Sequence, residues 1–168
     1  DEQVLSRSMR EYFSLGGIEA HVSSTGAQAL AMCREQEYPV ALVDIMLPDI
    51  SGLELIELLA GIYPRISIVI ITAVGSLETA KKAVSIPSVS AFVEKPFDAA
   101  RVFSYVSELI NRAETEARLD FRSAISNAVS NISFRMLSGS DIADSIRFSL
   151  GDVKIAAGAS GVFLSHKL

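Results

Sequence analysis

The 168-residue sequence lacks tryptophan, has a single cysteine and carries no excess of positive charge. Cys33 alone cannot form an internal disulfide, and its apolar neighbours Leu30 and Met32 predict a position in a helix core. The net charge is −5 with scattered basic residues, which argues against direct binding of nucleic acid or a membrane surface. No apolar run reaches the roughly 20 residues of a spanning helix, and the charged start is no signal peptide. A cytoplasmic location is the default expectation.

Apolar residues make up 49% of the sequence, which is enough to predict a packed globular core. Up to about residue 112, helix-like and strand-like segments alternate, as in a doubly wound α/β domain whose parallel sheet has helices on both faces. The predicted helices cover residues 4–13, 25–34, 52–62 and 77–84, and the predicted strands cover residues 18–22, 40–43, 68–71 and 89–93. The last three strands are apolar enough to be buried on both faces.

A long helical pattern follows, because no glycine or proline interrupts the sequence from Asp98 to Leu137. Apolar residues recur there at steps of three and four, and Asp98 is suited to cap the helix. We expect one long helix, with two ordinary helices as the alternative. Residues 113–137 would form a helical linker that pairs with a second copy as a coiled coil, giving a homodimer.

Reactive side chains follow three of the predicted strands, namely Asp44, Thr72 and Lys95. In an open parallel sheet such groups meet at the carboxyl edge, and Asp1 and Glu2 would join them there if a strand preceded them. This set suits formation of an acyl phosphate, with Asp44 as the nucleophile. Mg²⁺, which prefers oxygen ligands, would bind Asp1 and Asp44, while Lys95 and Thr72 would contact the phosphoryl oxygens.

Four motifs resemble the signature of response-regulator receiver domains from two-component signalling: Asp1-Glu2, LVDIMLPDISG at 42–52, IITA at 70–73 and EKPF at 94–97. The resemblance covers residues 1–112. It implies a flavodoxin-like fold with five strands in the order 2-1-3-4-5 and a cis peptide bond before Pro96. It also implies that Asp44 accepts phosphate from a phosphohistidine of a histidine kinase or phosphotransfer protein. The backbone carbonyl of Met46 would complete the Mg²⁺ site, with Glu2 beside it.

The same resemblance implies a conformational switch. When Asp44 is phosphorylated, Thr72 would move towards the phosphoryl group and Phe92 would turn inward, changing a surface for protein interaction. From composition alone, Phe92 is equally well explained as a core residue of a buried strand.

The sequence departs from the family pattern at two places. The first strand and a further acidic residue would be expected before Asp1, so either upstream residues are missing from the sequence or another segment takes the place of that strand. Met46 offers no acid or base two residues after Asp44, which leaves the lifetime of an acyl phosphate open.

Residues 138–168 resemble the opening of a GAF domain, with a helix around residues 141–150 and a first strand within residues 156–164. Such a domain needs more residues than remain, so we expect this part to be incomplete.

Two alternative functions stay open. One is a receiver-like binding or dimerisation module that is not phosphorylated. The other is a phosphatase of the haloacid-dehalogenase type, which resembles this sequence in placing a nucleophilic aspartate after a parallel strand. Those enzymes carry a second aspartate where this sequence has Met46. We therefore expect a signalling domain and no turnover enzyme.

Overall fold

The protein is described by a computed structural model that covers residues 2–73, 83 and 85–137. It divides into two compact units, Asp1–Ile110 and Asn111–Leu168. Its elements are α1 (Glu2–Leu15), α2 (Gly26–Glu35), β1 (Val40–Asp44), α3 (Gly52–Ile62), β2 (Ser67–Ala73), β3 (Val89–Lys95) and α5 (Ala99–Leu137). The helix predicted over residues 77–84 lies outside the described residues except for Ala83, and the GAF-like segment 138–168 lies wholly outside them.

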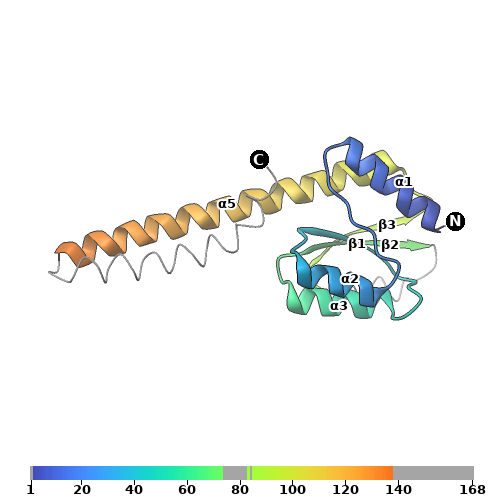
Figure 1. Cartoon of the computed structure of the whole chain (residues 1–168), viewed down its shortest axis with the longest axis horizontal. Coiled ribbons are helices and arrows are strands. Elements are labelled where there is room, and N and C mark those ends of the chain that lie inside the picture. The colour runs from blue at the N-terminus through green and yellow to red at the C-terminus, as the bar shows by residue number, and fades with distance from the viewer. Residues whose placement is uncertain (1, 74–82, 84, 138–168) are drawn as a thin grey trace. The chain divides into compact units, whose positions relative to one another are not determined.

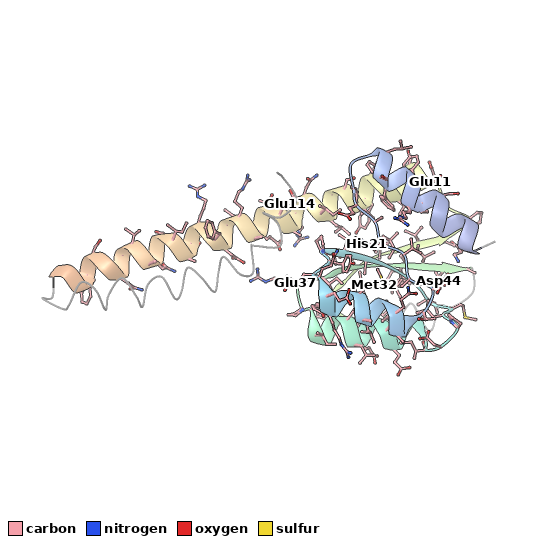
Figure 2. All side chains as sticks on the ribbon, viewed as in Figure 1. Glu11, His21, Met32, Glu37, Asp44 and Glu114 are labelled. Atoms are coloured by element: carbon pink, nitrogen blue, oxygen red, sulfur yellow. The ribbon has the colours of Figure 1, made fainter. Side chains whose placement is uncertain are left out.

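The three strands form a parallel sheet in the order β1-β2-β3, shown in Figure 1. Asp44 pairs with Ile71, and Ala73 pairs with Lys95, so the strands end at the same edge. Asp44 lies at this carboxyl edge in Figure 2. The register thus brings the ends of β1 and β3 to either side of the end of β2.

Helices cover both faces of the sheet, as the doubly wound pattern predicted (Figure 1). On one face, residues of α2 and α3 pack against alternate strand residues, and the buried members of this cluster are Cys33, Val43, Leu55, Ile56, Leu59, Ile66, Ile68, Ile70 and Ala83. On the other face, α1 and α5 contribute a second cluster whose buried members are Met9, Phe13, Val102 and Val106, and Val40 and Leu42 pack against it. Alternation along β1 therefore divides the core into two layers.

Burial on both faces is confirmed for β2, where Ile68, Val69 and Ile70 are all 0% exposed. For β3 that prediction was wrong. Its residues alternate between half-buried and exposed, because one face of β3 is packed and the other, with Ser90, Phe92 and Glu94, is exposed to solvent. An apolar run of five residues does not distinguish these two cases.

The predicted strand at residues 18–22 is absent, which corrects the sequence-based assignment. In the expected order 2-1-3-4-5, this strand has strand 1 as its only neighbour, and a strand needs such a neighbour for its backbone hydrogen bonds. No described segment pairs with residues 18–22. The segment instead packs by side chains, since the His21 ring meets Tyr38 edge-on at 5.7 Å (Figure 2). The described sheet thus corresponds to strands 3, 4 and 5 of the expected order.

Side chains cap the starts of two helices, and one of them is the predicted cap Asp98. Thr25 caps α2 by accepting a hydrogen bond from Gln28 N, and Asp98 Oδ1 accepts one from Ala100 N at 2.9 Å at the start of α5. Helix α1 ends at Gly16 and Gly17 in a Schellman motif. Ile18 N donates to Phe13 O, Gly17 N donates to Ser14 O, and Gly17 has a φ of 81°.

The 39-residue helix α5 is continuous, so the prediction of one long helix is confirmed and the two-helix alternative is wrong. It begins directly after Asp98 and extends to Leu137. Among the helices that the structure describes, none combines the length and apolarity needed to cross a bilayer.

Gly52 is the residue at which α3 must approach β1 most closely. A Cβ atom there would overlap the carbonyl oxygen of Asp44 and lie 2.6 Å from Ile45 Cα. These are backbone atoms at the end of β1, so they cannot move aside as a side chain could.

Gly52→Ala should therefore lower the free energy of unfolding by about 1–3 kcal/mol, through overpacking against backbone. Urea unfolding followed by circular dichroism measures this. Gly61→Ala is the matched control in the same helix, because a Cβ at Gly61 meets nothing within 4 Å and alanine favours helix. Equal stability of Gly52→Ala and wild type would contradict the close approach.

Candidate functional site

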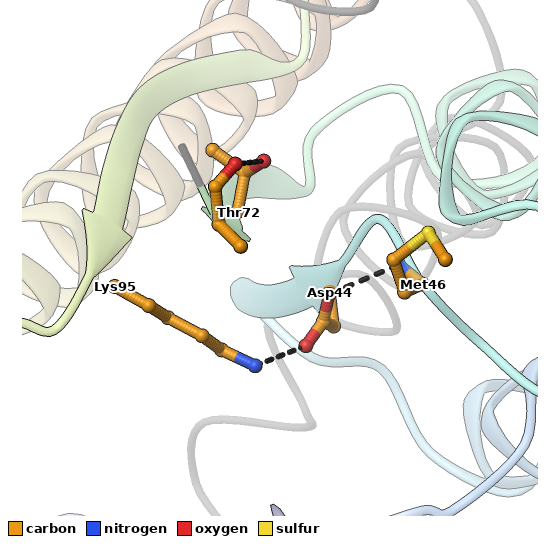
Figure 3. Close-up of polar contacts among 5 residues, drawn as sticks. Asp44, Met46, Thr72 and Lys95 are labelled. Carbon is orange, nitrogen blue, oxygen red and sulfur yellow. Dashed lines mark hydrogen bonds and ion pairs between the residues drawn. The ribbon is translucent and has the colours of Figure 1, made fainter. Parts of the chain in front are cut away.

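The site is centred on Asp44 and Lys95, whose side chains meet across the end of β2. Lys95 Nζ lies 2.5 Å from Asp44 Oδ2, and each side chain is 24% exposed (Figure 3). The carboxylate is thus neutralised by a cation yet still reachable from solvent. The peptide bond between Lys95 and Pro96 is cis, as the resemblance implied.

The loop after β1 folds back onto the carboxylate. Met46 N donates to Asp44 Oδ1 at 2.9 Å (Figure 3), and Met46 forms an isolated antiparallel bridge with Ser51. Both backbone polar groups of Ile45 are hydrogen-bonded: its N–H donates to Ile71 O, and its carbonyl accepts from Gly52 N. With Met46 N at Oδ1 and Lys95 Nζ at Oδ2, each carboxylate oxygen of Asp44 accepts a hydrogen bond. The Met46 side chain is 76% exposed and supplies neither acid nor base.

Thr72 takes its predicted place on β2, but its hydroxyl does not join the Asp44–Lys95 pair. The hydroxyl donates to the carbonyl of Ala73 at 3.0 Å, and this is the contact drawn at Thr72 in Figure 3. Thr72 pairs in register with Glu94. The structure thus brings two of the three predicted strand-end groups into contact and places the third beside them.

Phe92 is 38% exposed on the solvent-facing side of β3, so the alternative of a buried core phenylalanine is wrong. Its role as a switch residue stays a prediction.

The other predicted metal ligands are the acidic residues at the start of the chain. Asp1 lies outside the described residues, and Glu2 begins α1 without a described side chain. In the part of the chain that the structure describes, no three His, Cys, Asp or Glu side chains are grouped so as to hold a metal ion. The predicted metal ligands with described positions are Asp44 and the Met46 backbone.

Asp49 is a site-loop residue whose role sequence reasoning missed. Its Oδ1 accepts from Gly26 N and its Oδ2 from Ala27 N, both at 2.9 Å. The N–H groups of Ala27 and Gly26 lower the pKa of this carboxyl group. The available signal was an acidic residue in the loop just before α3. Asp49 instead caps α2, which begins more than 20 residues earlier and so lies beyond the range of local capping rules.

An aspartate and a lysine thus meet at the carboxyl edge of the parallel sheet of an α/β domain. The family model "Response regulator receiver domain" matches residues 1–107. The regulatory protein LuxO of Vibrio vulnificus is 30% identical over 104 residues, which are 62% of this chain and 23% of LuxO. This chain therefore spans about a quarter of the length of that relative.

Two solved structures are similar to about two thirds of this chain. A CheY-like receiver domain protein from Methanospirillum hungatei is 25% identical with a TM-score of 0.61, covering 69% of this chain and 91% of its own. The receiver domain of NtrX from Brucella abortus is 26% identical with a TM-score of 0.57, covering 64% and 88%. The chain belongs to the response regulator receiver domain family and has the flavodoxin-like receiver fold.

The lowered pKa of Asp49 predicts an acid-dependent contribution to stability. In the unfolded chain an aspartate titrates near ~3.9, so the folded state holds the proton less tightly than the unfolded state. The stabilisation is complete above that value and is lost as the pH falls through the lower folded pKa. Asp49→Asn should melt below wild type at pH 7, and the difference should shrink at pH 3, as measured by calorimetry.

Glu57→Gln removes the same charge from an exposed position on α3 and serves as the control. A difference for Asp49→Asn that stays constant from pH 7 to pH 3 would show that these N–H bonds do not prefer the ionised carboxylate.

Proposed function

We propose that this chain accepts a phosphoryl group on Asp44 from the phosphohistidine of a histidine kinase or a phosphotransfer protein. The observation that carries the proposal is the contact of Lys95 Nζ with Asp44 Oδ2 across the end of β2. A carboxylate paired with a cation, partly exposed at a sheet edge, can act as a nucleophile that an incoming phosphoryl group reaches. The chain would be a signalling domain and no turnover enzyme.

In this transfer an oxygen of Asp44 attacks phosphorus, an O–P bond forms and the P–N bond of the phosphohistidine breaks. The imidazole leaves with the electron pair of that bond. The Lys95 ammonium would stay close to the new acyl phosphate and stabilise the charge on its oxygens. Thr72, whose hydroxyl now donates to Ala73 O, would turn to donate to a phosphoryl oxygen. Phe92 would then move inward from its exposed position and change the surface around β3.

The residues near Asp44 suit a magnesium ion by their donor chemistry. Mg²⁺ favours carboxylate and carbonyl oxygens. The Met46 N–H bond to Asp44 folds the loop so that the Met46 peptide lies beside the carboxylate. Asp44, the Met46 carbonyl and Asp1, with Glu2 nearby, are the proposed ligands. The ion would neutralise negative charge on the phosphoryl oxygens.

We further propose that the chain forms a homodimer through the second half of α5. Ala113, Ala117, Phe121 and Ala124 follow one another at steps of four, four and three, and each is half-buried. Such a row allows two long helices to approach closely.

A cytoplasmic location and the GAF-like nature of residues 138–168 stay predictions of the sequence.

Phosphoryl acceptance can be tested by intact mass spectrometry after incubation with acetyl phosphate and Mg²⁺. Wild type should gain one phosphoryl group, and Asp44→Asn should gain none. Lys95→Met should slow the reaction by about a hundredfold, since it removes one preorganised cation from the developing charge. Folded wild-type protein that gains no phosphoryl mass would overturn the proposal in favour of an unphosphorylated binding module.

The dimer can be tested by light scattering of Ala124→Glu. A buried, unpaired carboxylate between two helices is costly, so this variant should be monomeric where wild type is dimeric. Ser126→Glu places the same charge on an exposed position of the helix and should remain a dimer. Ala124 suits this test better than Ala128, because Ala128 is only 5% exposed and a charge there would also disturb packing within the single chain. A monomeric wild type, or equal masses for all three proteins, would contradict the proposal.

A further inference from the structure

We infer that Asp49 is a positioning residue for the phosphoryl-transfer site: it fastens the loop after Asp44 to the start of α2, and so holds the Met46 peptide against the Asp44 carboxylate. The inference rests on the proposed function of Asp44. Asp49 itself touches no reacting atom, and acts through the loop of residues 45–51.

The contact between Asp49 and α2 uses both carboxylate oxygens. Oδ1 accepts from Gly26 N and Oδ2 from Ala27 N, each at 2.9 Å. The next N–H, that of Gln28, donates to Thr25 Oγ1 at 3.1 Å. The start of α2 is therefore capped from two sources: Thr25 from its own segment and Asp49 from the loop after β1.

A second contact at the same place shows that the loop is seated on α2. A Cβ atom on Gly26 would lie 2.5 Å from Ile50 Cδ1, so the absence of a side chain at Gly26 leaves room for Ile50. Gly26 is buried, and Ile50 packs against the core between α2 and α3. Neighbouring residues of the loop thus make a polar and an apolar contact with the same helix end.

The other end of the loop reaches the site. Met46 N donates to Asp44 Oδ1, Met46 bridges to Ser51, and Gly52 N donates to Ile45 O. Between Met46 and Ser51 the chain runs through Asp49, and only Leu47 and Pro48 separate Asp49 from Met46, so a shift of Asp49 would be passed to Met46. Because phosphoryl transfer depends on alignment of the reacting groups, a small displacement of this peptide should slow the reaction.

Charge favours the same arrangement. The N–H groups of Ala27 and Gly26 lower the pKa of Asp49. The positive end of a helix dipole also favours an ionised carboxylate at this position. The Asp49 carboxylate consequently occupies the N-terminus of α2, which is not free to bind a phosphate.

A positioning role has to be separated from ordinary stabilisation of α2. Thr25→Ala is the matched control, because it removes a cap from the same helix end without touching the loop. Asp49→Ala removes the other cap and the loop attachment together. Both variants should melt below wild type, since loss of either leaves helix N–H groups unpaired.

Two measurements separate the variants. In hydrogen–deuterium exchange of the full chain, Asp49→Ala should raise exchange of the Met46 and Gly52 amides, and Thr25→Ala should leave them at wild-type rates. With acetyl phosphate and Mg²⁺, Asp49→Ala should be phosphorylated about tenfold more slowly than wild type, and Thr25→Ala at the wild-type rate. Asp49→Asn, which keeps one acceptor oxygen and the size of the side chain, replaces Asp49→Ala if that variant does not fold.

The inference is overturned if Asp49→Ala and Thr25→Ala change exchange and phosphorylation by equal factors, since Asp49 would then only cap α2. It is also overturned if Asp49→Ala leaves the Met46 amide protected. If wild type accepts no phosphoryl group, the proposed function fails, whereas the exchange experiment still decides whether Asp49 holds the loop.

Discussion

The ion pair between Asp44 and Lys95 depends on the parallel register of three strands, and the remaining features of the site follow from that register. Neighbouring strands lie about 4.8 Å apart, so β1 and β3 are separated by roughly 10 Å across β2. A shorter cationic side chain could not span that distance. The four-carbon stem of Lys95 crosses the end of β2 and brings Nζ to Asp44 Oδ2 at 2.5 Å. The buried strand β2, with Ile68 and Ile70 fully enclosed, keeps this spacing constant.

Close backbone packing around β1 gives the aspartate its second neighbour. Gly52 lets α3 start against the Asp44 carbonyl, and the loop between them returns the Met46 N–H to the carboxylate. Asp49 attaches this loop to α2. Three elements that are distant in sequence thereby determine the geometry around one carboxylate, which is how a reactive group can be held in place while part of it faces solvent.

The arrangement also explains why one strand of the sheet is suited to transmit a signal. β3 ends in Lys95 at the site and exposes alternate residues, among them Phe92, along its length. In the function that we propose, a change in charge at Asp44 would act on Lys95 and reach the exposed side of β3 within the same strand. Helix α5 begins just after β3 and continues without interruption to Leu137, so the receiver domain is followed directly by a long helical segment.

Local patterns in the sequence were sufficient for the described helices, for the two apolar strands that carry Asp44 and Thr72, and for the cap at Asp98, because each depends on residues a few positions apart. The convergence of Asp44 and Lys95 was also predictable, since the ends of parallel strands share an edge. Tertiary structure decided what depends on partners far away in sequence. Residues 18–22 alternate like a strand yet have no described strand to pair with, and β3 is apolar yet half-exposed because only one of its faces is packed. Asp49 has its role only because α2 begins beside it, and the hydroxyl of Thr72 donates to the Ala73 carbonyl.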